Sequence, residues 1–310
     1  MIKRTLYFGN PSYLSLKNDQ LVLKLPEVEA NNTLTDEFKQ LNVKTFPIED
    51  IGVVILDHKQ ITITQALLEK LLENNCAVIT CDTHRMPTGL LLPLEGNTLQ
   101  EERFSYQIGA ALPLKKQLWQ QTVSRKIENQ AAVLMAHTDA DTGCMMQWAK
   151  QVKSGDSDNL EARAAIYYWA NLFPNIPHFS RDRSGGFPNA WLNYGYAILR
   201  AVVARALVAT GLLPTFGIHH RNRYNAYCLA DDIMEPYRPY VDAAVVQLMT
   251  QFDEDEGLSK TVKAHLLQIP VTEVVIQNHR SPLMVAVATT ANSLYKCYAG
   301  GTKKVIYPKM

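Results

Sequence analysis

Residues 193–242 read NYGYAILRAVVARALVATGLLPTFGIHHRNRYNAYCLADDIMEPYRPYVD, and this stretch decides what the chain can fold into. Apolar residues recur three and four positions apart in its first part, which predicts a helix over 187–211. Pro214 ends that pattern, and a polar segment rich in Arg, Asn and His follows. A second helical pattern covers 229–251. We therefore predict two core helices joined by a loop that carries titratable side chains.

The same helical spacing extends outward over most of the chain, whereas strand-like runs fill its first part. The predicted helices are 99–111, 114–136, 140–152, 158–173, 187–211, 229–251, 258–266 and 282–297. The predicted strands are 5–8, 12–16, 20–25, 43–48, 52–56 and 76–80, accompanied by one helix at 64–74 that Thr64 caps. We expect an α+β fold. A small β-rich N-terminal domain (1–95), built as one sheet with a helix against it, precedes a larger all-α C-terminal domain (96–310).

The composition excludes several classes of protein. Of the 310 residues, 47% are hydrophobic and 20% are charged, which is typical of a globular protein and not of a disordered one. The five cysteines are scattered and form no CxxC pair, so neither a zinc knuckle nor a disulfide framework is predicted. No signal peptide is visible, and Arg200 and Arg205 interrupt the most apolar stretch. We expect a cytoplasmic protein with no membrane span.

Glu161 is the first candidate for chemistry, and it stands near the start of the helix predicted over 158–173. Asp158 is the predicted N-cap of that helix, which places Glu161 at its third position. A glutamate at this position often reaches back to the cap residue as part of a capping box. A structural role and a metal-binding role are therefore both open for Glu161.

Two further groups of polar residues lie after Pro214. His219 and His220 follow an apolar turn segment, where a histidine has either a structural or a ligand role. Asp232 and Glu235 are three residues apart at a helix start, so they share one face of a helix. The alternative for both acids is an acidic first turn that complements the helix dipole.

Together these positions supply one imidazole and two or three carboxylates from separate elements. Hard oxygen donors favour Mg²⁺ or Mn²⁺ over Zn²⁺, and an imidazole tilts the choice slightly towards Mn²⁺. We therefore predict a divalent metal site made by Glu161, His220 and Glu235, with Asp232 as an additional acid.

Arginines surround the predicted metal site. Residues 178–238 contain seven arginines and no lysine, although the formal net charge of the whole chain is only +1. A guanidinium group binds a phosphate through two parallel hydrogen bonds, so this clustering favours a phosphodiester substrate. The candidate DNA contacts are Arg181, Arg183, Arg221, Arg223 and Arg238.

The stretch quoted first, preceded by GDSDNLEARAAIYYW (155–169), resembles the CRISPR-associated spacer-acquisition integrases, and most closely their type II branch. Three motifs carry the resemblance. They are the Asn-Tyr-Gly-Tyr opening, the glycine-flanked turn into the histidine, and the helix start Asp-x-Met-Glu-Pro-x-Arg-Pro. The resemblance spans nearly the whole chain, because a β-rich N-terminal domain and a helical C-terminal domain are also that family's layout.

The resemblance implies a metal-dependent DNA endonuclease and integrase. A 3′-hydroxyl of a DNA fragment, the spacer, attacks a phosphodiester at the boundary of a CRISPR repeat. In that family a glutamate, a histidine and an acidic residue hold the metal, and by motif these match Glu161, His220 and Glu235, beside Asp232. The implied partners are double-stranded DNA (spacer precursor and repeat), a second copy of the chain bound through the β-rich domain, a small ferredoxin-like companion subunit in a heterohexamer, and the type II effector nuclease.

Two other functions remain open on the sequence. A structure-specific DNA repair nuclease would use the same site without integration, and a strand-transfer assay separates the two. A non-catalytic DNA-bridging scaffold would use the acids only as helix caps. Loss of metal binding on substitution of Glu161 or His220 separates that scaffold from a metal enzyme.

Overall fold

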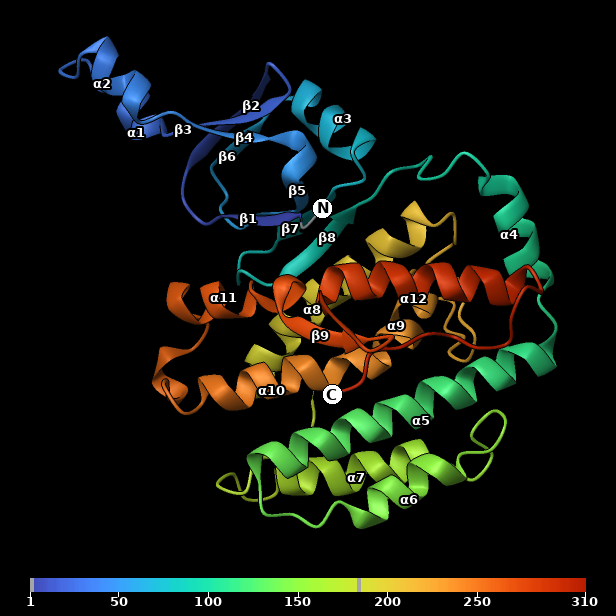
Figure 1. The fold of residues 1–310 in the computed structure, drawn as a ribbon. Helices are drawn as coiled ribbons and strands as arrows, with labels where there is room; N and C mark the ends of the chain where they lie inside the picture. The colour runs from blue at the N-terminus through green and yellow to red at the C-terminus, as the bar shows by residue number, and fades with distance from the viewer. Residues whose placement is uncertain (1–2, 183–184) are drawn as a thin grey trace. The chain divides into compact units, whose positions relative to one another are not determined.

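The computed structural model describes residues 3–182 and 185–310, so Arg183, one of the predicted DNA contacts, lies outside the described residues. The chain divides into two units, Met1–Gly96 and Asn97–Met310 (Figure 1). The division falls one residue from the boundary that the change of sequence pattern predicts. The α+β class, with a strand-rich first unit and a mainly helical second unit, is confirmed.

The N-terminal unit contains two four-stranded sheets where the sequence predicted one. The first sheet consists, in spatial order, of β1 (Arg4–Phe8), β5 (Ile51–Leu56), β7 (Ala77–Cys81) and β8 (Pro87–Leu91). The second consists of β4 (Lys44–Pro47), β3 (Gln20–Lys24), β2 (Ser12–Lys17) and β6 (Ile61–Ile63). Strands β6 and β8 escaped prediction because β6 has three residues and β8 contains Pro87 and Gly89, which both lower strand propensity.

Parallel pairing explains the apolar run in β5. This strand lies between β1 and β7 and runs parallel to both, so its backbone is paired on both edges. Val53, Val54 and Ile55 are completely buried, as expected of a strand that is covered on both faces. Helix α3 (Gln65–Glu73) begins as predicted, with the Thr64 side chain accepting a hydrogen bond from the Leu67 backbone. Two short helices, α1 (Pro26–Glu29) and α2 (Asp36–Leu41), complete the unit.

The C-terminal unit is built mainly from helices that follow the predicted segments. They are α4 (Gln100–Gly109), α5 (Leu112–His137), α6 (Gly143–Gln151), α7 (Leu160–Leu172), α8 (Asn189–Ala209), α9 (Cys228–Met234), α10 (Arg238–Leu248), α11 (Lys260–Leu266) and α12 (Leu283–Tyr298). The long helix α5 packs against α6 and α7, and α8 packs against α9, α10 and α12 (Figure 1).

The helix predicted over 229–251 is interrupted. It forms α9, then the 3₁₀ turn η2 (Glu235–Tyr237), and then α10. Pro236 lies inside the turn, and a proline has no backbone N–H to continue the α-helical hydrogen bonds. The interruption separates Asp232, on α9, from Glu235, on η2.

The prediction that this unit is all-α is wrong, because it also contains a β-hairpin. Strands β9 (Glu273–Ile276) and β10 (His279–Pro282) pair antiparallel. Both residues of the turn, Gln277 and Asn278, have positive φ angles of 51° and 64°. Two residues in this conformation make the type of turn whose twist matches a two-residue hairpin.

Helix α8 is a core helix. Within the described residues, it alone is long and apolar enough to cross a membrane by length and composition, but 67% of its apolar window is buried inside the protein. Its Arg200 donates a hydrogen bond from Nε to Asp231 of α9 at 2.7 Å. Burial and this ion pair place α8 among its neighbouring helices.

A buried carboxyl group joins α7, α8 and α10. Asp242 accepts hydrogen bonds from the hydroxyl groups of Tyr168, at 2.9 Å, and of Tyr196. Burial raises the pKa of Asp242 to about 6, and its two tyrosine partners and nearby arginines lower it only in part. The folded protein therefore binds a proton here more tightly than the unfolded chain does.

We expect this proton to make stability depend on pH. The neutral form of Asp242 is favoured in the fold, so the free energy of unfolding falls as the pH rises from 4 through 6. A difference of this size between folded and unfolded pKa is worth at most about 3 kcal/mol. Urea unfolding of the wild type and of Asp242→Asn between pH 4 and 7 measures it. A constant gap between the two proteins would contradict a raised pKa.

Candidate metal centre

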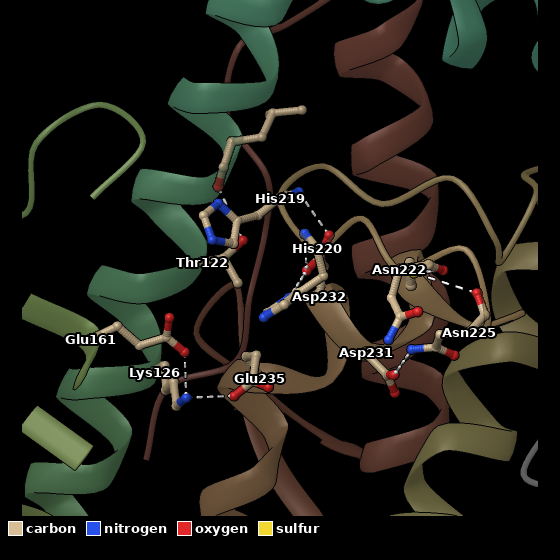
Figure 2. A network of polar contacts seen from close by, with 12 residues as sticks. Thr122, Lys126, Glu161, His219, His220, Asn222, Asn225, Asp231, Asp232 and Glu235 are labelled. Carbon is tan, nitrogen blue, oxygen red and sulfur yellow. Dashed lines mark hydrogen bonds and ion pairs between the residues drawn. The ribbon is translucent and has the colours of Figure 1, made fainter. Parts of the chain in front are cut away.

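Five separate elements bring polar side chains together in the C-terminal unit. Lys126 lies on α5, Glu161 lies in the first turn of α7, and His220 lies on the loop between α8 and α9. Asp232 lies on α9 and Glu235 on η2. Figure 2 shows Glu161 and Glu235 on either side of Lys126, with His220 beside Asp232.

The start of α7 is held by Asp156. The Asp156 carboxylate accepts hydrogen bonds from the backbone N–H groups of Leu160, at 2.9 Å, and Glu161, at 3.0 Å. The prediction of Asp158 as the cap is wrong, because the cap residue Asn159 adopts a left-handed conformation that turns the chain back to Asp156. Asp158 forms an ion pair with Lys153 instead.

The Glu161 side chain does not close a capping box. Its Oε1 accepts a hydrogen bond from Lys126 Nζ at 2.6 Å, which directs the carboxylate away from the helix end and into the cluster (Figure 2). The helix-capping alternative for this glutamate therefore does not describe the contacts that its side chain makes.

Asp232 orients the histidine loop. This carboxylate is completely buried, with 0% of its surface exposed. His220 Nδ1 lies 2.5 Å from Asp232 Oδ1, and the backbone N–H groups of His219 and His220 also donate to the carboxylate. The contact raises the pKa of His220. With Nδ1 engaged, the distal Nε2 of His220 is the nitrogen that a metal ion can take.

His219 has a different environment from its neighbour. Its ring stacks on Trp119 of α5, with centroids 4.2 Å apart and the planes nearly parallel. Burial lowers the pKa of His219, and the neighbouring His220 lowers it further. The His220 ring meets Trp119 edge-on, with centroids 5.4 Å apart, and it is the His220 ring that contacts the carboxylate of Asp232.

The loop can approach Asp232 this closely because residue 217 is a glycine. A Cβ at Gly217 would collide with the carbonyl oxygen of His220 and the carboxylate of Asp232. Any side chain here would push the loop away from α9. Gly217 therefore allows the loop to hold His220 against Asp232.

Glu235 is a buried carboxylate with two cationic neighbours. It is 6% exposed, and its Oε1 lies 2.9 Å from Arg238 Nε while its Oε2 lies 2.6 Å from Lys126 Nζ. Burial raises the pKa of Glu235, but Arg238 and Lys126 outweigh that effect and lower it to about 2. Asn129 of α5 holds the turn in place by donating to the carbonyl oxygen of Pro236 at 2.7 Å. Glu235 is therefore ionised and firmly positioned at neutral pH.

Lys126 is the site residue that sequence reasoning missed. It occupies the buried face of α5, spaced by four residues from Thr122 and by three from Asn129, both completely buried. A run of polar residues on the buried face of a long helix was the available signal, because buried polar groups need partners. Its partners, Glu161 and Glu235, belong to distant parts of the sequence.

The predicted DNA-contacting arginines fall into two groups. Arg181 donates to Asn189 and Asn193, and Arg238 pairs with Glu235, so both are engaged within the protein. Arg221 and Arg223 are exposed on the loop that carries His220, where Arg223 lies over the ring of Tyr224. Of the described candidates, these two are available to a phosphate backbone.

The donor set is chemically suited to a hard divalent cation. It combines an imidazole nitrogen with the two carboxylates of Glu161 and Glu235, and one oxygen of each carboxylate lies 2.6 Å from the same cationic nitrogen, Lys126 Nζ. Within the described residues, no three His, Cys, Asp or Glu side chains already cluster closely enough to hold a metal ion. In this structure the ammonium group of Lys126 lies between the two acids.

The sequence is similar to those of known proteins. The family model described as CRISPR associated protein Cas1 matches residues 7–278. The CRISPR-associated endonuclease Cas1 of Neisseria meningitidis serogroup C is 35% identical over 305 residues, which cover 98% of this chain and 94% of that protein.

Solved structures share the fold. A casposase bound to its integration product has a TM-score of 0.75 at 20% identity, over 98% of this chain and 92% of that one. A chain of a Cas6-RT-Cas1–Cas2 complex has a TM-score of 0.72 at 19% identity, over 97% of this chain and 35% of that one. The family model and the Neisseria relative cover most of the sequence, and the chain therefore belongs to the Cas1 family of CRISPR-associated proteins.

Proposed function

We propose that this chain is a divalent-metal-dependent DNA endonuclease and integrase that inserts DNA fragments into a CRISPR repeat array by transesterification. Glu161, His220 and Glu235 hold Mg²⁺ or Mn²⁺, and Asp232 orients His220. The observation that carries the proposal is the Asp232–His220 contact, which fixes an imidazole beside two carboxylates that converge on one cation.

Each side chain has a separate part in this mechanism. Asp232 holds His220 through Nδ1 and two backbone N–H groups, so that Nε2 faces outward from α9. Glu161 and Glu235 supply negative charge from the first turn of α7 and from η2. A bound divalent ion would polarise the phosphoryl oxygen and stabilise the charge that develops when a 3′-hydroxyl attacks. No covalent bond to the protein is needed.

The similar proteins support the DNA and partner assignments. A casposase has been solved with its integration product, and a related chain has been solved in a Cas1–Cas2 complex. For this chain we propose double-stranded DNA, as spacer precursor and as repeat, together with a second copy bound through the β-rich unit. A small ferredoxin-like companion subunit would complete a heterohexamer. The type II effector nuclease as a partner and a cytoplasmic location stay predictions from the sequence.

A strand-transfer assay tests the proposed function. The full-length protein, with and without the companion subunit, is incubated with a short duplex and a supercoiled plasmid that carries a repeat. We expect joined products with Mg²⁺ and with Mn²⁺, and none after removal of metal with EDTA. Cleavage without joining in both preparations would favour the repair-nuclease alternative. DNA binding without metal-dependent chemistry would favour the scaffold alternative.

Arg221 and Arg223 are expected to bind the phosphate backbone of DNA. Each phosphate contact releases counterions, so the affinity falls with salt in proportion to the number of contacts. Replacing both arginines with alanine is expected to reduce the slope of log affinity against log salt by about 2. Fluorescence anisotropy with a labelled duplex measures the slope.

Arg280 provides a matched control for this prediction. It is an exposed arginine of the same unit, but it lies on β10 and pairs with Glu273. Arg280→Ala is expected to leave the slope unchanged. A double variant of Arg221 and Arg223 with the wild-type slope would show that the loop does not contact DNA.

A further inference from the structure

The ammonium group of Lys126 lies between two carboxylates of the C-terminal unit. The side chain is 12% exposed, and its Nζ lies 2.6 Å from Glu161 Oε1 and 2.6 Å from Glu235 Oε2. The two carboxylates come from different elements, α7 and η2, and both point at this one nitrogen (Figure 2). Lys126 therefore ties together two elements that each supply a proposed metal ligand.

The energetics of burial explain why such a lysine is needed. Two carboxylates brought together in a partly buried cluster repel each other and lose their hydration, so a cation between them is strongly stabilising. Arg238 Nε lies 2.9 Å from Oε1 of Glu235, whereas Lys126 Nζ lies 2.6 Å from Oε2 of Glu235 and from Oε1 of Glu161. Without Lys126 the two inward-facing oxygens would have no positive charge between them.

A divalent cation and an ammonium group cannot both occupy this position. Metal–oxygen distances to carboxylates are about 2.0–2.6 Å for Mg²⁺, Mn²⁺ and similar ions, which is the space that Nζ now fills. Lys126 must therefore leave before both carboxylate oxygens can bind a metal. Its contacts thus oppose metal binding while they stabilise the metal-free protein.

We propose that Lys126 is a positioning residue that serves as an internal counter-ion, holding Glu161 and Glu235 in place when no metal is bound and setting the metal affinity of the site by competing for their oxygens. This inference rests on the proposed function, since it requires these two glutamates to be metal ligands. Lys126, on α5, thus sets how readily the site binds a metal ion. This role is separate from the strand-transfer reaction itself.

Two substitutions isolate the charge of Lys126. Lys126→Met keeps the length of the side chain but removes the charge and the hydrogen bonds. Lys126→Gln removes the charge but keeps an N–H donor for the carboxylates. It replaces the methionine variant if that variant does not fold. Lys126→Arg keeps the positive charge. Lys263→Met is the matched control, because Lys263 is a buried lysine of the same unit that lies over the ring of Tyr194, on α8.

The measurements are the melting temperature of the full-length protein in EDTA and the affinity for Mn²⁺ from electron paramagnetic resonance. We expect Lys126→Met and Lys126→Gln to melt at lower temperature without metal and to bind Mn²⁺ about tenfold more tightly, because a close competing charge is removed. Lys126→Arg is expected to stay near the wild type in both properties. Lys263→Met is expected to melt earlier with unchanged Mn²⁺ affinity.

The outcomes separate the two levels of the proposal. If the wild type binds no Mn²⁺, the proposed metal site fails and this inference fails with it. If the wild type binds Mn²⁺ and the Lys126 variants bind it equally well or more weakly, only the counter-ion role is overturned. Tighter binding by the glutamine variant, and not by Lys263→Met, supports the role.

Discussion

Replacing His220 with asparagine is expected to abolish metal-dependent cleavage and strand transfer while the metal-free protein stays folded. The asparagine amide can still donate a hydrogen bond to Asp232, as Nδ1 of His220 does. It has no nitrogen in place of Nε2, however, so the proposed metal site loses one ligand. Metal ions stabilise phosphoryl transition states by several kcal/mol, so we expect a loss of about a thousandfold or more in rate. Integration of a short duplex into a supercoiled plasmid measures the loss.

His219→Asn is the control for this result. His219 is adjacent in sequence, but its ring stacks on Trp119. We expect His219→Asn to retain most of the integration activity, and both variants to bind DNA, since the exposed arginines are unchanged. Loss of activity in the His219 variant with retention in the His220 variant would show that the other histidine is the ligand. An unfolded His220→Asn protein would indicate a structural role for that histidine.

Asp232→Ala is expected to cause the largest loss of stability among the site residues. The carboxylate is completely buried and accepts hydrogen bonds from two backbone N–H groups and from the ring of His220. Removing one partner of a buried charged network leaves the others unpaired, which costs about 3–5 kcal/mol. Urea unfolding measures this change, and the integration assay is expected to show that activity is lost as well, because His220 is no longer oriented.

The neighbouring acid provides the comparison for Asp232. Asp231 is also largely buried, but its partners are the side chains of Arg200 and Asn225, and Arg200 is partly exposed. Water can replace an exposed partner, so Asp231→Ala is expected to cost about 1–2 kcal/mol. Equal losses for the two variants would mean that Asp232 does not have a special role in holding the loop.

The sequence predicted the class of the fold because that class depends on local patterns. The spacing of apolar residues located the helices from α4 to α12 within a few residues. It failed where a break or a short pairing decides the structure. Pro236 divides one predicted helix, and the hairpin of β9 and β10 depends on the positive φ angles of Gln277 and Asn278. In the second sheet of the N-terminal unit, β6 likewise pairs with β2, a strand that is not its neighbour in sequence.

The sequence by itself determined the family and the kinds of donor atom in the candidate site, because motif spacing and residue chemistry are properties of short segments. Only the tertiary structure decided what each donor does. Asp232 has its partners on the loop of His220, Asp156 takes the capping role predicted for Asp158, and Lys126 lies between Glu161 and Glu235. These contacts join different elements, and a buried charge finds its partner through packing and not through its position in the sequence.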